Sequence, residues 1–551
     1  MTTPPAPGRG PVRRIAAATA ALLLAAACTP GPDPAGQAPP GVLRVLGGSE
    51  LADLEPILAD AEEATGVRIE LTQSGTLDGL ERVAAGEADG EYDALWFSSN
   101  HYLSLLPGGR DRVATETPVM ASPVVLGVTE SAARRLGWDG GAEVGWRDIA
   151  DAAASGELEY GMTNPAASNS GFSALVAVAA AFSDTGAALR EEDVPGVAAE
   201  LTDFFTGQAL TSGSSGWLQQ SFAARAADPA TALDGLVNYE SVLLSLNASG
   251  DLPEPLTLVY PAEGAVTAGY PLTLLASADA DAAARYEAVA AFLRSAATQE
   301  RIMAETHRRP AEPSVELAAG FGPASYPELP FPATSGAVDA LLAGYLDHYR
   351  RPSRTVFVLD FSGSMEGERI DGLRAALGTL AGGAAPEGAA RFQRFYGREQ
   401  VTLLPFNHVP LIPQRFELPA DGREDVLADI RAAAAEHPVG GGTAVYDSLE
   451  RGYQLLAEQA EEDEGEDATD HISTIVLMSD GENTDGGTLA DFEAAYAALP
   501  ADLATVPVFT VLFGDANEAE MERVAELTGG RSFDARTVPL DEVFREIRGY
   551  Q

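Results

Sequence analysis

Short apolar runs that alternate with helix-spaced segments constrain the fold of this chain more than any other feature of its sequence. Residues 42–48 read VLRVLGG, and residues 51–66 then carry apolar side chains at helical spacing up to Gly66. The same unit recurs and starts afresh at residue 354 with RTVFVLDFS. Apolar strands alternating with amphipathic helices are typical of parallel sheets covered on both faces. The pattern predicts an α/β protein.

The length of 551 residues exceeds what one ordinary core accommodates, so we expect more than one domain. Composition shifts place the boundaries. The expected order is a signal peptide (1–27), a Pro/Gly tether (28–41), a first α/β domain (42–315), a linker with one helix (316–351) and a second α/β domain (352–549).

The composition excludes several functions. The formal net charge is −47, and the chain contains no lysine. Such a charge repels phosphate backbones, so nucleic acid is not an expected partner. Without lysine the chain can form neither a Schiff base nor a P-loop. No nucleophile–base motif stands out either, so we do not expect an enzyme.

The N-terminus has the organisation of an export signal. Arg9, Arg13 and Arg14 precede an apolar run that ends at Cys28 and is too short to be a permanent membrane span. Cys28 is the only cysteine, so no intramolecular disulfide can form. The segment LLLAAAC resembles the lipobox of bacterial lipoproteins, although Ala25 stands where leucine is commoner. The resemblance implies lipidation of Cys28 and anchoring on the extracellular face of the cell membrane; a soluble secreted protein is the alternative.

Small polar residues follow the strands expected in the first domain. Ser49 follows the first strand, and Ser98 and Ser99 follow the third. A parallel sheet binds ligands beyond the carboxyl ends of its strands, so these residues are candidates for solute binding. Each could equally be a turn former or a helix cap.

The first domain also resembles a known family. The segments LRVLGGSELADLEPIL, GMTNPAASNSGFSALVAVAAAF, LVNYESVLL and YPAEGAVTAGYPLTLL resemble extracellular solute-binding proteins of the type II periplasmic-binding fold. The resemblance implies two lobes that close around a solute, with crossovers near residues 123–131 and 256–264.

The same resemblance places further candidate ligands for the solute. Ser168, Asn169 and Ser170 would start a helix in the second lobe, where free backbone N–H groups suit a small polar or anionic molecule. Tyr239, with Glu240 and Tyr260, falls where the family often contacts its solute. Packing between the lobes is the alternative role of these residues.

A cluster of oxygen-bearing side chains is expected in the second domain. Asp360, Ser362 and Ser364 leave a buried strand at every second position, so they can face one point. A glycine-rich loop supplies Thr443, and a second apolar strand ends at Asp480. Two carboxylates and three hydroxyls are hard donors, which favour Mg²⁺ or Mn²⁺.

These five residues match the metal-ion-dependent adhesion site of von Willebrand factor type A domains, which the second domain resembles. The resemblance implies a doubly wound fold in which the three hydroxyls bind the ion. Asp360 and Asp480 would bind it directly or through water, and an Asp or Glu of a partner protein would complete the coordination.

Together these features predict a lipoprotein of actinobacterial type that binds a solute through one domain and a protein through the other. The alternative is the substrate-binding component of an ABC-type transport system, with the second domain as a docking module.

Overall fold

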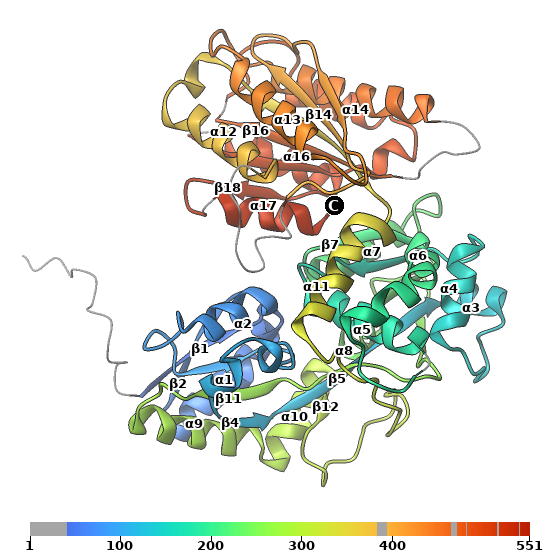
Figure 1. Cartoon of the computed structure of the whole chain (residues 1–551), viewed down its shortest axis with the longest axis vertical. Helices are drawn as coiled ribbons and strands as arrows, with labels where there is room; N and C mark the ends of the chain where they lie inside the picture. Colours follow the sequence, from blue (N-terminus) through green and yellow to red (C-terminus); the bar gives the residue numbers. More distant parts are fainter. Residues whose placement is uncertain are drawn as a thin grey trace, which may run out of the picture. The chain divides into compact units, whose positions relative to one another are not determined.

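The structure, a computed structural model, describes residues 41–183, 185–382, 394–463, 471–480, 482–514, 517–538 and 540–551 (Figure 1). The expected signal peptide, Cys28 and the tether up to residue 40 lie outside these residues. Their roles therefore stay predictions.

The first lobe is built on a five-stranded sheet in the order β2-β1-β3-β11-β4. β1 pairs in parallel with β2 and β3, whereas β11 runs antiparallel to β3 and β4. The strands are β1 (Val42–Gly47), β2 (Arg68–Gln73), β3 (Ala94–Trp96), β4 (Val113–Pro118) and β11 (Pro271–Leu275). The helices are η1 (Ser49–Leu54), α1 (Glu55–Thr65), α2 (Thr76–Ala85), η2 (Leu103–Leu105), η3 (Gly109–Arg112), α9 (Ala280–Leu293) and α10 (Ala296–Thr306). α1 ends at Gly66, whose φ of 70° closes the helix in the left-handed conformation that glycine adopts most easily.

The second lobe has a sheet in the order β10-β5-β8-β6-β7, and β9 and β12 also pair with β5. Its strands are β5 (Met120–Thr129), β6 (Tyr160–Thr163), β7 (Gln208–Ser212), β8 (Gly235–Tyr239), β9 (Leu256–Val259), β10 (Thr267–Ala268) and β12 (Arg309–Pro310). Its helices are α3 (Glu130–Leu136), α4 (Trp146–Ala154), α5 (Asn169–Ser183), η4 (Glu191–Val197), α6 (Ala198–Thr206), α7 (Ser215–Ala226) and α8 (Glu240–Ser249).

The lobe crossovers lie close to the segments expected for them, but outside them. Residues 123–131 and 256–264 contain β5 and β9, which pair with each other inside the second sheet. The chain changes sheets at Val119, between β4 and β5, and again at residues 269–270, between β10 and β11. Apolar composition predicts a strand but carries no information about which of two sheets the strand joins.

The segment expected as a linker packs against the first domain. It contains α11 (Ser335–Gly344) and the π-helical turn η5 (Tyr345–Tyr349), and α11 contributes Val338, Leu341 and Leu342 to the core of the first domain. Upstream of α11, the Leu329 N–H donates to the Ala265 carbonyl at 2.9 Å. Backbone bonds and apolar contacts thus order this part of the chain.

The second domain has a six-stranded sheet in the order β15-β14-β13-β16-β17-β18, parallel except for the edge strand β15. The strands are β13 (Ser353–Asp360), β14 (Gln400–Phe406), β15 (Gln414–Glu417), β16 (Ile472–Ser479), β17 (Val508–Leu512) and β18 (Ser532–Asp534). The helices are η6 (Gly363–Met365), α12 (Glu368–Leu380), α13 (Glu424–Glu436), α14 (Val445–Glu462), α15 (Leu489–Tyr496), η8 (Leu503–Thr505), α16 (Glu518–Thr528) and α17 (Leu540–Gly549).

β13 is buried on both of its faces. Phe357 and Leu359 join one core, whereas Val356 and Val358 join the core on the other side of the sheet. This explains why the strand reads as a continuous apolar run. The prediction of a doubly wound α/β domain is confirmed.

The strand order places a topological switch point at β13. The chain passes from β13 to β14 on one side and later returns to β16 on the other side of β13. Ligands of open α/β sheets bind at such a point, beyond the carboxyl ends of the strands. Asp360 ends β13 there, and Asp480 follows β16.

Candidate functional site

The carboxylate of Asp360 is fully buried at the end of β13 and is held on both oxygens. Its Oδ1 accepts a hydrogen bond from the Ser362 N–H at 2.8 Å, and its Oδ2 accepts one from the Ser479 hydroxyl at 2.6 Å. Burial raises the pKa of Asp360, the two serines oppose that effect, and the negative charge of Asp480 adds to it. A bound cation would reverse this penalty.

The other residues of the predicted metal set form a chain of hydroxyl contacts. The Oγ atoms of Ser362 and Ser364 lie 3.0 Å apart, and the Ser364 hydroxyl donates to Asp480 Oδ1 at 2.9 Å. Ser364 is exposed, so the cluster opens to solvent on its side. The fold thus joins two segments that are 116 residues apart in the sequence.

Thr443 comes from a third segment, which backbone hydrogen bonds tie to the other two. The Gly363 N–H donates to the Gly441 carbonyl at 3.0 Å. The Thr443 N–H donates to the Thr484 hydroxyl at 2.8 Å, close to Asp480 in the sequence. Gly441 has a φ of 91°, and a Cβ there would lie 3.2 Å from His408 Nδ1, so glycine suits the turn.

The chemistry of this donor set fits Mg²⁺ or Mn²⁺. Both carboxylates are almost fully buried, and their neighbours are hydroxyls rather than soft ligands. Across the described ranges no group of three or more His, Cys, Asp or Glu side chains is arranged to hold a metal. At the candidate site, hydroxyls would have to supply much of the coordination.

Two residues at this site were missed from the sequence. Ser479 immediately precedes Asp480. Its place at the end of an apolar strand could have indicated that it supports the neighbouring carboxylates. Arg369, the second residue of α12, forms an ion pair with Asp480 Oδ2 and also donates to the Ser364 carbonyl at 3.2 Å. No spacing rule pointed to Arg369.

In the first domain, two of the predicted solute-binding residues, Ser98 and Asn169, lie at the hydroxyl of a third, Tyr239. Asn169 Nδ2 donates to the Tyr239 hydroxyl at 2.9 Å. Burial raises the pKa of Tyr239 well above its ordinary value, and the side chains of Ser98 and Asn169 oppose that rise. Ser98 follows β3 of the first lobe and Asn169 starts α5 of the second, so this cluster joins the two lobes.

The remaining predicted solute residues divide into two groups. Ser170 Oγ lies 3.2 Å from Ser168 Oγ, 2.7 Å from Thr163 Oγ1 and 2.7 Å from Ser215 Oγ. Ser49 is exposed at the start of η1, and Ser99 accepts a bond from the His101 N–H at 3.2 Å. Ser168 and Ser170 thus belong to a hydroxyl cluster at the start of α5, apart from these two loop serines.

Glu240 and Tyr260 lie in a buried ion-pair cluster that also contains Arg309. Arg309 contacts both Glu240 oxygens, through Nε at 2.6 Å and Nη2 at 2.7 Å, and the Tyr260 hydroxyl donates to the same carboxylate. The Gly322 N–H adds a bond at 3.1 Å. This arrangement fixes the region where β12 and β5 pair.

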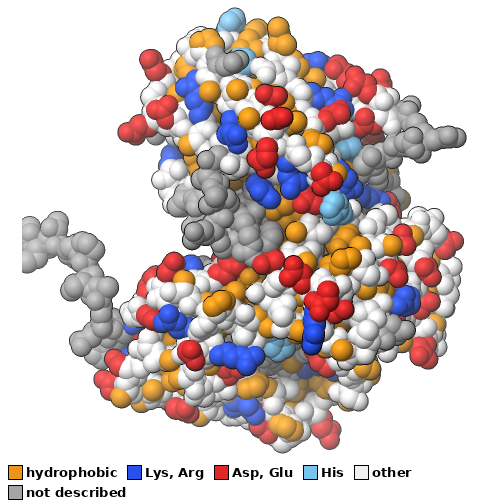
Figure 2. Space-filling model, in the orientation of Figure 1, with side chains coloured by type: hydrophobic (Ala, Val, Ile, Leu, Met, Phe, Trp, Pro, Cys, Tyr) orange, Lys and Arg blue, Asp and Glu red, His pale blue; other side chains and the backbone are white. Residues whose placement is uncertain are grey.

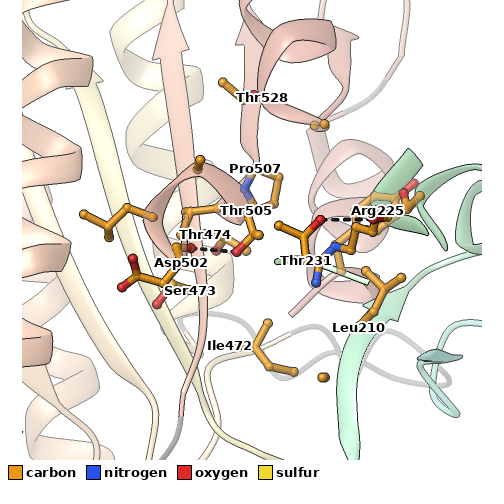
Figure 3. A pocket seen from close by; sticks show the side chains of 18 of the residues that line it. Leu210, Arg225, Thr231, Ile472, Ser473, Thr474, Asp502, Thr505, Pro507 and Thr528 are labelled. Carbon is orange, nitrogen blue, oxygen red and sulfur yellow. Dashed lines mark hydrogen bonds between the residues drawn. The ribbon is translucent and has the colours of Figure 1, made fainter. Parts of the chain in front are cut away.

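A cavity of about 940 Å³ is lined in part by the six-stranded sheet of the second domain (Figure 3). It lies at the end of that sheet opposite to Asp480. Its lining includes Ile472, the first residue of β16, and Pro507, which precedes β17, together with Leu210, Arg225 and Thr231. The amino ends of the strands face it, so the cavity is separate from the candidate metal site.

The two parts of the chain each match a protein family. Residues 43–305 match the model of bacterial extracellular solute-binding proteins, a class of binding proteins rather than enzymes. Residues 355–546 match the model of the von Willebrand factor type A domain. The chain therefore carries a solute-binding domain followed by a von Willebrand factor type A domain.

Individual relatives cover parts of the chain. Human inter-alpha-trypsin inhibitor heavy chain H4 is 29% identical over 163 residues, which are 28% of this chain and 16% of that protein. Iron-bound HitA from Pseudomonas aeruginosa is 16% identical, with coverage of 55% of this chain and 98% of HitA and a TM-score of 0.43. AfuA from Actinobacillus pleuropneumoniae, solved with fructose-6-phosphate, is 14% identical, with coverage of 56% and 98% and a TM-score of 0.42.

The match to an extracellular solute-binding family indicates a secreted or surface protein. Among the residues that the structure describes, every helix is too short or too polar to cross a membrane.

Proposed function

We propose that this protein is a lipid-anchored surface protein that binds a protein partner through a divalent metal in its second domain and a small polar or anionic solute in its first. The hydrogen-bonded set of Asp360, Ser362, Ser364 and Asp480 at the switch point of the sheet carries the proposal. With Thr443, these residues would hold Mg²⁺ or Mn²⁺. The ion would supply a positive centre that accepts a carboxylate of the partner.

The charge of the chain supports a role for the metal in partner binding. The net charge is −47, and acidic side chains are spread over the face shown in Figure 2. Such a surface repels an approaching Asp or Glu. A dication that keeps open or water-filled positions reverses the local sign, because Mg²⁺ seldom sits in a closed cage of protein ligands.

Exposed apolar side chains beside the metal set support a protein as the partner. Val409 is 44% exposed and Ile412 is 83% exposed, both in the loop between β14 and β15. Asn407 of this loop accepts a bond from the Ala444 N–H at 2.7 Å, directly after Thr443. We infer a partner whose carboxylate is flanked by apolar residues, since exposed apolar patches are common at protein interfaces.

Cys28 would anchor the protein through lipid, and the cluster of Ser98, Asn169 and Tyr239 would contact the solute. The match of residues 43–305 also favours a second candidate function, the capture of a solute for an ABC-type transporter. In that case the second domain would dock onto the transporter, and deletion of the gene would abolish uptake of the solute.

The purified chain, immobilised and incubated with detergent-solubilised envelope of its own cells, tests the first function. We expect a protein that is retained in Mg²⁺, released by EDTA and not retained by the Asp360→Ala variant. A set of retained proteins that is the same in Mg²⁺, in EDTA and with the variant would contradict metal-dependent binding.

A further inference from the structure

Arg369 occupies the coordination environment of a predicted metal ligand. It forms an ion pair with Asp480 Oδ2, while Ser364 holds the other oxygen of the same carboxylate. A divalent cation that uses Asp480 would meet a guanidinium already in place. The site has two carboxylates, and Arg369 neutralises one of them.

Three segments keep the guanidinium at this position. Arg369 belongs to α12, and its Nη1 donates a hydrogen bond of 3.2 Å to the Ser364 carbonyl. The guanidinium also lies against Gly514, a residue without a side chain that follows β17. A Cβ on Gly514 would lie 2.8 Å from the Arg369 guanidinium carbon. A larger residue at Gly514 would therefore push the arginine away from Asp480.

The two partners differ in their access to water. The Arg369 side chain is 36% exposed, whereas that of Asp480 is 1% exposed. Arg369 can therefore turn into solvent and recover its hydration. Asp480 stays buried and needs a replacement cation, because a buried charge left without a partner is costly.

We propose that Arg369 competes with the divalent metal for Asp480 and so lowers the metal affinity of the site. This inference rests on the metal site proposed above. The arginine and the metal are alternative counter-ions of one carboxylate, and they repel each other at short range. The metal occupies the site only where its concentration, or the carboxylate of a partner, outweighs Arg369.

Calorimetric titration of the purified full chain with MgCl₂ at neutral pH tests the proposal. Arg369→Gln removes the charge and keeps a polar side chain. Arg369→Lys keeps the charge. Arg523→Gln is the matched control, since Arg523 pairs with Glu493 at 2.7 Å on the surface of the same domain. Far-UV circular dichroism of each variant verifies folding.

We expect Arg369→Gln to bind Mg²⁺ about tenfold more tightly than the wild type, as loss of one competing charge at short range implies. Arg369→Lys should stay closer to the wild type than Arg369→Gln, and Arg523→Gln should match the wild type. Equal or weaker binding by Arg369→Gln would overturn the proposal, as would equal tightening in Arg369→Lys or Arg523→Gln. No Mg²⁺ uptake by the wild type or any variant would instead contradict the metal site itself.

Discussion

The Ser479 hydroxyl donates a hydrogen bond of 2.6 Å to Oδ2 of Asp360. Ser479 is the residue before Asp480, so the end of β16 positions the carboxylate at the end of β13. The two predicted carboxylate ligands are thus linked through a residue that is not itself expected to bind the ion.

Ser479→Ala should weaken Mg²⁺ binding about tenfold, because hydrogen bonds that orient metal ligands often contribute that much affinity. Ser473→Ala, near the other end of the same strand, is the control and should bind as the wild type does. Calorimetry measures both. Equal affinities for the two variants would show that Asp360 needs no support from Ser479.

Asp360→Ala should abolish saturable Mg²⁺ binding, since it removes the carboxylate at the centre of the set. We expect the unfolding free energy without metal to fall by only about 1–2 kcal/mol, because the loss of the hydrogen bonds from Ser362 and Ser479 is partly offset by relief of the desolvation of a buried carboxylate. The control is Asp502→Ala, which removes an exposed carboxylate at the other end of the domain. Calorimetry in moderate salt suppresses background binding to surface acids; equal uptake by Asp360→Ala and the wild type would refute the assignment.

Cys28→Ser should prevent lipidation and leave precursor in the membrane or release protein into the medium. Membrane fractionation and gel mobility measure the outcome, with Thr29→Ser as the control. Unchanged mobility and membrane retention in Cys28→Ser would mean that the chain is held by something other than a lipid on this cysteine.

Asn169→Ala should weaken binding of a small polar or anionic solute, because it removes the donor to Tyr239 at the start of α5. A thermal-shift screen of metabolites identifies the solute, since a ligand of the folded state raises stability with its concentration. Ser183→Ala, at the last residue of α5, is the control. A stabilising compound that shifts Asn169→Ala as much as the wild type would place the solute elsewhere.

Glu399→Gln should destabilise the second domain by about 3 kcal/mol at pH 7, the cost of breaking a buried ion pair. Glu399 is fully buried between Arg350 and Arg548, with Arg548 Nη2 2.7 Å from its Oε1. Burial alone would raise the pKa of Glu399, but the two guanidiniums lower it below its ordinary value.

The pH dependence of this effect follows from the lowered pKa. Glu399 contributes its stability above the unfolded-state value of about 4.3 and loses it as the pH falls through the folded-state pKa. Calorimetric unfolding should therefore show the gap between wild type and Glu399→Gln narrowing below about pH 4. The exposed Glu417→Gln variant is the control, and a gap that stays constant down to acid pH would contradict the ion pair.

The sequence predicted the four central strands of the second domain, β14, β13, β16 and β17, because each is largely apolar. The edge strands β15 and β18 read QRFE and SFD, and these short polar segments carried no such signal. Asp360 and Asp480 could be predicted because both end such strands, and parallel strands bring their carboxyl ends together.

Contacts that depend on the path of another segment could not be predicted. The direction of the Arg369 side chain depends on the absence of a side chain at Gly514, which is 145 residues further along the sequence. The crossovers of the first domain were misplaced for a related reason, since sheet membership is set by tertiary pairing. The segment before α11 has little periodicity, yet its backbone bonds to Ala265 order it.

The central position of β13 has a mechanical consequence. Arg354–Asp360 pair with β14, and Ser353–Leu359 pair with β16. A partner that pulls on Asp360 would apply force along the strand, so that both ladders of backbone hydrogen bonds are loaded in shear. Many bonds would then share the tension, which would suit the partner-binding role proposed above.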